Sequence, residues 1–206
     1  MKPVKVIAGL GNPGDHYART RHNVGAVYVE DLARRFGITL AEETRFKARV
    51  GRGTVLGHDV RLMVPTTYMN DSGEALGALH RFYKVDPQAF LVCYDEVAFD
   101  PGVVKIKFGG GANGHNGIKS TISGFGNQQG FLRLRIGVGH AGSKDRMVAF
   151  LTSVAMPESE RRLVEDALRF DDQVLGFLLE GDHQKAMTAL HSAEKDTDER
   201  KQSDGI

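Results

Sequence analysis

Residues 4–14, VKVIAGLGNPG, contain a short apolar run followed by Gly9, Gly11 and Gly14 in the spacing G-x-G-x-x-G. An apolar run that ends in a glycine turn is typical of the first strand of an α/β sheet, and in many enzymes such a turn holds the phosphates of a dinucleotide. The stretch therefore predicts an α/β fold, and it leaves open what the glycine-lined backbone is for.

A dinucleotide site requires the glycine turn to open a helix, with an acidic residue at the end of the next strand about 20 residues further on. This turn meets neither requirement. Pro13 removes one of the N–H groups that would hold the pyrophosphate, and residues 15–21 lack helical spacing of apolar side chains. The acids at the expected distance, Glu30 and Asp31, fall within a predicted helix, and no G-K-[ST] follows the turn to make a P-loop. The sequence therefore disfavours a nucleotide site here.

Outward from the turn, apolar periodicity predicts alternating strands and helices. Strands are expected over residues 4–10, 89–95, 103–109 and 131–139, with a hairpin over 46–65. Helices are expected over 22–37, 70–84 and 157–181, with a shorter helical piece to about 191. This order favours one α/β domain, residues 1–191, with a twisted mixed β-sheet sandwiched between helices. The polar segment 192–206 is expected to be a disordered tail.

Local signals refine several of these elements. Asp71 and Glu74 have the spacing of a capping box at the start of the second helix. The long C-terminal helix should bury one face that includes Leu163 and Val174. Segments 103–109 and 131–139 alternate apolar and basic residues, so each strand is predicted to expose a cationic face to water.

Composition narrows the class of protein. The 206 residues are 41% hydrophobic and 26% charged, which is typical of a folded globular chain. We expect no contact with membranes, because there is no apolar run of about 18 residues and the N-terminus turns polar too soon for a signal peptide. The single cysteine, Cys93, lies in an apolar run, where a thiol is more often a small buried hydrophobe than a nucleophile. A reducing cytoplasm is the expected compartment.

Positive charge is concentrated in one segment. Residues 101–146 hold seven lysines and arginines against a single acid, together with twelve glycines. Such a segment suits phosphate binding, because the glycines let backbone approach a ligand closely. A solvated basic surface without a ligand fits the charge equally well.

Polar residues stand at the ends of several apolar segments. They are Asn12, His22, Asn70, Asp95, His115 and Asn116. Each has a structural explanation as a turn, cap or buried histidine, but the carboxyl ends of strands line the ligand crevice of open α/β sheets, so several could converge. Together they include an imidazole, a carboxylate to orient it and three carboxamides. That set suits a base-activated water that attacks a carbonyl group.

Five blocks of sequence resemble the bacterial peptidyl-tRNA hydrolase family. They are GLGNPGDHYARTRHNVG, TTYMNDSG, YDEVAFDPG, GGGANGHNGIKS and FLRLRIGVGH, in that order over residues 4 to about 140. The resemblance implies a monomeric α/β enzyme without cofactor or metal. It would cleave the ester between a peptide and the 3′-terminal ribose of tRNA, and so recycle tRNA from stalled translation.

The resemblance also implies roles for individual residues. His22 would be the base toward water, with Asp95 holding its imidazole. Asn12, Asn70 and Asn116 would bind the peptide main chain and the terminal nucleotide or place the water. The crevice would be lined by Tyr17 and Met69, with His115 beside it. The tRNA-contacting surface falls on the basic segment, where the candidates for phosphate contacts are Lys107 and Arg135, with Lys105 and Lys119 nearby.

Four positions depart from the family pattern, and all concern the rim of the crevice. They are Val64, Ala98, Ala112 and Asn113. Two other functions stay open at this stage: a non-catalytic RNA-binding relative, which would bind tRNA without cleaving the ester, and a nucleotide-dependent enzyme that uses the glycine turn and would respond to dinucleotides.

Overall fold

The computed structural model describes residues 1–170 and 172–192, and its centre is a seven-stranded mixed sheet in the order β2-β3-β4-β1-β5-β7-β6. The strands are β1 (Val6–Gly9), β2 (Ala41–Glu43), β3 (Ala48–Val55), β4 (His58–Pro65), β5 (Phe90–Glu96), β6 (Val104–Phe108) and β7 (Leu132–Gly137). The four central strands, β4, β1, β5 and β7, run parallel, and the edge strands pair antiparallel. The predicted mixed sheet is confirmed; β2 was not predicted. The predicted tail begins at residue 192, which instead lies in the last described helix, and the other residues of the tail, 193–206, lie outside the described residues.

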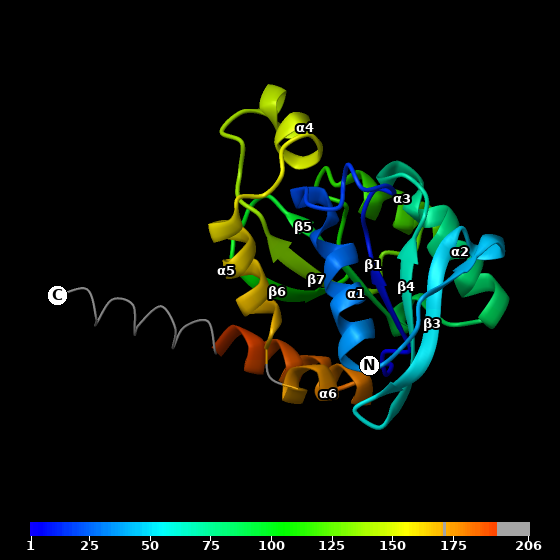
Figure 1. Ribbon diagram of the computed structural model, residues 1–206. Coiled ribbons are helices and arrows are strands. Elements are labelled where there is room, and N and C mark those ends of the chain that lie inside the picture. The colour runs from blue at the N-terminus through cyan, green and yellow to red at the C-terminus, as the bar shows by residue number, and fades with distance from the viewer. Residues whose placement is uncertain (171, 193–206) are drawn as a thin grey trace.

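Helices cover both faces of the sheet (Figure 1). They are α1 (Val24–Arg35), α2 (Ser72–Tyr83), α3 (Asn116–Gly124), α4 (Lys144–Thr152), α5 (Glu158–Leu168), α6 (Asp172–Glu180) and a last helix over residues 183–192. One buried core lies between the sheet and α1, α5 and α6, and the other lies between the sheet and α2 and α3. No helix of the described residues is long and apolar enough to cross a membrane.

Strand β5 lies inside the sheet, and its first five residues, 90–94, form a continuous apolar run. All seven of its residues are buried, because helices cover both of its faces. Cys93 is fully buried there, and burial raises the pKa of its thiol, so it serves as a core residue.

The glycine turn allows α1 to pack directly on strand backbone. A Cβ atom on Gly25 would stand 2.1 Å from the carbonyl oxygen of Cys93, and one on Gly9 would stand 2.2 Å from the carbonyl oxygen of Gly25. The N–H of Ala26 donates to the carbonyl of Leu10 at 3.0 Å. The bare backbone of Gly9 and Gly25 therefore brings helix and sheet into direct contact.

Gly25→Ala is expected to lower the free energy of unfolding by about 1–3 kcal/mol or more, because the new methyl group must push α1 off β5. Chemical denaturation measures this change. Gly176→Ala in α6 is the matched control, since its Cβ would meet no atom within 4 Å, and it should be neutral or slightly stabilising. Equal stability of the two variants would contradict the packing argument.

Three local predictions are wrong. The predicted helix over 157–181 is two helices, and Asp172, in the first turn of α6, forms an ion pair with Arg35. Leu163 is exposed, and α5 buries Val164 instead. The capping box does not form, because Glu74 bonds to the Lys47 ammonium group at 2.5 Å.

Candidate active site

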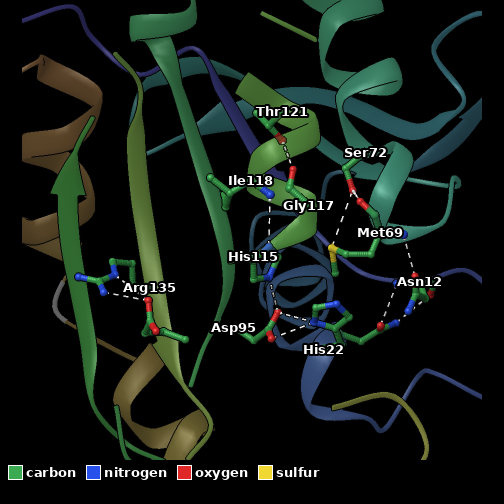
Figure 2. Close-up of polar contacts among 12 residues, drawn as sticks. Asn12, His22, Met69, Ser72, Asp95, His115, Gly117, Ile118, Thr121 and Arg135 are labelled. Atoms are coloured by element: carbon green, nitrogen blue, oxygen red, sulfur yellow. Dashed lines mark hydrogen bonds and ion pairs between the residues drawn. The ribbon is translucent and has the colours of Figure 1, made fainter. Parts of the chain in front are cut away.

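Two histidines share one buried carboxylate at the carboxyl end of β5. His22 lies in the short 3₁₀ turn Arg21–Asn23 before α1, and its Nδ1 is 2.8 and 2.9 Å from the two carboxylate oxygens of Asp95. His115, the N-cap of α3, places Nε2 2.9 Å from Asp95 Oδ1. The Asp95 side chain is 1% exposed, while the two rings are 10–12% exposed. Figure 2 shows both rings converging on Asp95.

The hydrogen bonds assign different tautomers to the two rings. A carboxylate only accepts, so Nδ1 of His22 carries the proton and Nε2 keeps a free lone pair. The N–H of Ile118 donates to His115 Nδ1 at 3.2 Å, so the proton of a neutral His115 ring lies on Nε2. His22 is therefore the ring that can accept a proton, whereas both nitrogens of His115 are engaged.

Burial and Asp95 act on His22 in opposite directions. Burial lowers the pKa of His22, but the charge of Asp95 and its hydrogen bond outweigh burial and raise that pKa above its ordinary value of 6.5. Burial would raise the pKa of Asp95, but the adjacent His115 and His22 hold it well below its usual range. Asp95 therefore remains a carboxylate at neutral pH.

Asn12 is fixed in place by a second carboxamide. Asn23 donates from Nδ2 to the backbone carbonyl of Asn12 and accepts from its N–H, both at 2.9 Å. Asn12 Oδ1 in turn accepts the N–H of Met69 at 2.7 Å. The amide nitrogen of Asn12 is thus left to donate to a ligand. Asn23, the residue before α1, makes no side-chain cap bond and instead holds the glycine turn.

Arg21 ties the His22 segment to the C-terminal helices. Its guanidinium is buried, bonds Glu160 of α5 at 2.6 Å and lies 3.9 Å from the centre of the Phe150 ring of α4. The turn that carries His22 is therefore held against two helices, α4 and α5.

These groups open into a cleft of about 760 Å³. Its polar side is lined by seven of the residues predicted for the site, namely Asn12, His22, Met69, Asn70, Asp95, His115 and Asn116. Tyr17 is not part of the lining; its ring packs edge-on against Tyr68, which does line the cleft. The structure thus brings the predicted chemistry to one place.

The opposite wall of the cleft was not predicted from the sequence. It is formed by Lys144, Met147, Val148, Leu151 and Thr152 of α4. None of the residues of α4 is buried, and the helix stands clear of the sheet at the top of Figure 1. The apolar residues at 147, 148 and 151 have helical spacing, and that was the signal available in the sequence.

The basic candidates lie outside the cleft. Lys105 and Lys107 on β6 pair across the strands with Arg135 and Arg133 on β7, on the face of the sheet that α3 covers, and Lys119 is exposed on α3. Arg135 donates from Nε and Nη2 to Glu96 Oε2, at 3.0 and 2.8 Å, apart from the histidines (Figure 2). The predicted cationic outer face is wrong for Arg133, which is 2% exposed.

Three of the four residues that depart from the family pattern lie at the cleft or contact a residue that lines it, and the fourth lies elsewhere. Ala112 and Asn113 line the cleft. The N–H of Ala98 donates to Glu96 Oε1 at 3.0 Å, and Glu96 also lines the cleft. Val64 is buried and lines a separate pocket on the other side of Asn12.

Among the described residues, His22, Asp95 and His115 are the one group with metal-ligand chemistry, with ligand atoms within 4.8 Å of one another. Both histidine nitrogens that face Asp95 carry protons in the network above. A metal ion would have to displace both protons, so the group suits proton transfer better than metal binding.

The cleft brings together an imidazole with a free Nε2, a buried carboxylate behind it and several carboxamides, and its lining includes no serine or cysteine among the described residues. This arrangement suits the class of hydrolases that act through activated water. The chain belongs to the peptidyl-tRNA hydrolase family, whose family model matches residues 6–199.

Relatives and solved structures agree with this membership. A peptidyl-tRNA hydrolase of Aeromonas hydrophila is 49% identical over 92% of this chain and 95% of that protein. One from Tolumonas auensis is 46% identical, with 93% and 96% covered. The crystal structure of peptidyl-tRNA hydrolase from Acinetobacter baumannii is 41% identical, covers 91% of this chain and 94% of its own, and superposes with a TM-score of 0.86.

Proposed function

We propose that this protein cleaves the ester between a peptide, or an N-acylated amino acid, and the 3′-terminal ribose of tRNA. The observation that carries the proposal is the His22 ring, held by Asp95 through Nδ1 with Nε2 free at a cleft lined by carboxamides. An ester of this kind is cleaved by water once a base removes its proton.

In this reaction His22 Nε2 takes a proton from water while the water oxygen bonds to the carbonyl carbon. Asp95 stabilises the imidazolium that forms, because its carboxylate accepts a hydrogen bond from Nδ1–H and remains ionised. The bond from carbon to the ribose 3′ oxygen then breaks, and the imidazolium returns its proton to that oxygen. The products are the free peptide carboxyl group and the tRNA hydroxyl group.

The carboxamides bind the reacting carbonyl and the peptide main chain, which all substrates of this kind share. Asn12 has its oxygen committed to Met69, so its amide nitrogen donates to the reacting carbonyl. Asn70 and Asn116 are exposed at the cleft and bind the peptide main chain or place the water. Recognition of main chain leaves the side chains of the peptide free to vary.

The tRNA body would contact the basic side chains outside the cleft. Lys107 and Lys119 are exposed, Lys105 is half-buried, and Arg135 has Nη1 left over beside its two bonds to Glu96. Phosphate contacts give affinity for any tRNA without reading its sequence. We also infer that the protein acts as a monomer in the cytoplasm, where translation uses tRNA; light scattering after gel filtration tests the monomer.

Purified protein is expected to release N-acetyl-amino acid from N-acetyl-aminoacyl-tRNA and to leave the free aminoacyl-tRNA intact. The logarithm of kcat/KM should fall linearly with the logarithm of salt concentration, because tRNA releases counterions when basic side chains bind its phosphates. Each phosphate contact contributes about one to the slope. Single-turnover assays over a salt series measure both. Binding of tRNA without cleavage would instead indicate a non-catalytic RNA-binding protein.

A further inference from the structure

Arg133 is a basic residue of β7 that cannot contact tRNA from where it lies. It is 2% exposed, and among the described residues it has no ion-pair partner. Its Nη1 donates to the carbonyl of Gly111 at 2.6 Å and its Nη2 donates to the carbonyl of Gly110, while the guanidinium lies 4.6 Å from the centre of the Phe131 ring. Burying a cation costs free energy unless the cation is hydrogen-bonded, so we expect these bonds to the loop carbonyls to have a structural role.

The loop that Arg133 bonds carries cleft residues at its far end. Residues 109–115 join β6 to α3, and Gly109, Gly110, Asn113 and Gly114 all have positive φ. A glycine-rich loop gains little rigidity from its own side chains, so its shape depends on bonds from outside. His115, the last residue of this loop, and Asn116, the first residue of α3, line the cleft.

A second contact path joins Arg133 to the same histidine. Arg133 interacts with the buried Tyr94, and the Tyr94 ring meets the His115 ring edge-on, with 4.8 Å between their centres. His115 is thus supported from the loop on one side and from Tyr94 on the other, and Arg133 contacts both supports.

We propose that Arg133 is a positioning residue, whose two bonds to the glycine carbonyls hold loop 109–115 so that His115 and Asn116 stay in the cleft. This inference rests on the proposed function. It assigns the basic residues of β7 to two tasks: Arg135 faces the tRNA, and Arg133 organises the loop from beneath.

The test compares Arg133→Gln with Lys107→Gln, its exposed cross-strand neighbour, and with Arg169→Gln, an exposed arginine of the same charge change. Each is assayed on N-acetyl-aminoacyl-tRNA and on N-acetyl-aminoacyl-adenosine, which has no phosphate. Arg133→Gln should lose about ten- to hundredfold in kcat/KM on both substrates with an unchanged salt slope, as expected for displaced site residues. Lys107→Gln should lose activity on tRNA with a slope reduced by about one, and Arg169→Gln should match the parent protein.

Hydrogen exchange separates a local role from general stability. In Arg133→Gln the amides of residues 110–118 should exchange faster, while those of β1 and β5 keep their protection. If Arg133→Gln does not fold, Arg133→Lys replaces it, because the lysine keeps the charge but a single ammonium group cannot span both carbonyls.

Three outcomes would overturn the proposal: full activity of Arg133→Gln, a loss confined to the tRNA substrate with a reduced salt slope, or uniformly faster exchange in all strands. If the parent protein cleaves neither ester, the proposed function fails. The exchange measurement still decides whether Arg133 holds the loop.

Discussion

His22→Ala is expected to fold like the parent protein and to lose roughly 10²- to 10⁴-fold in kcat, the usual contribution of a general base. The ring is held by Asp95 alone among the hydrogen bonds described, and it lies at the open cleft, so its removal should leave the core intact. Single-turnover cleavage of N-acetyl-aminoacyl-tRNA measures the loss. Thermal unfolding and the Kd for tRNA should change little.

His58→Ala is the matched control, because His58 lies at the β3–β4 hairpin, away from the cleft. It should keep the turnover of the parent protein. Normal turnover in His22→Ala would contradict the mechanism and require another base. His115 is poorly suited to replace it, since its Nδ1 accepts the N–H of Ile118 and its Nε2 donates to Asp95.

The main architecture could be predicted because burial leaves a pattern along the chain. The first five of the seven buried residues of β5 form an unbroken apolar run, and the hairpin of β3 and β4 lies within the predicted range 46–65. Local polar signals were less reliable, because a polar side chain can have several possible partners and the sequence does not show which of them it bonds. Glu74 could cap α2 or pair with Lys47, and the pairing prevails.

Burial of Arg133 could not be predicted from strand alternation. Alternation places Arg133 on the same face of the sheet as Lys107, which is exposed. Arg133 is buried only because loop 109–115 folds over β7 and supplies the carbonyls that its guanidinium bonds. The wall made by α4 was missed for a related reason. A helix without buried residues has no strong apolar stripe, and its role depends on where the chain places it over the cleft.

The convergence of polar residues from several strand ends could be predicted, because parallel strands end at one edge of the sheet. Asn12 after β1 and Asp95 at the end of β5 meet there as expected. The sequence could not show how they are held. The exchange of two hydrogen bonds between Asn23 and Asn12, and the capping bond that fixes the His115 tautomer, depend on distances that only the folded chain defines.

Asp95→Asn should lower kcat by roughly 10²- to 10⁴-fold, even though the new side chain has nearly the same shape. His22 Nδ1 contacts both oxygens of Asp95, so one of its contacts becomes an amide NH₂ group, which donates. That contact favours the tautomer with the proton on Nε2, and such a ring cannot accept a proton from water. Single-turnover kinetics at neutral pH measures the loss.

The same variant should also move the acid limb of the pH–rate profile to lower pH. A base is active when it is neutral, so activity rises as the pH passes its pKa. In the parent protein Asp95 outweighs burial and raises the pKa of His22; without that charge, burial alone acts and the pKa falls below 6.5. The residual activity of Asp95→Asn should therefore reach its plateau at a lower pH than that of the parent. An acid limb that stays in place or moves upward would mean that the titrating base is a group other than His22.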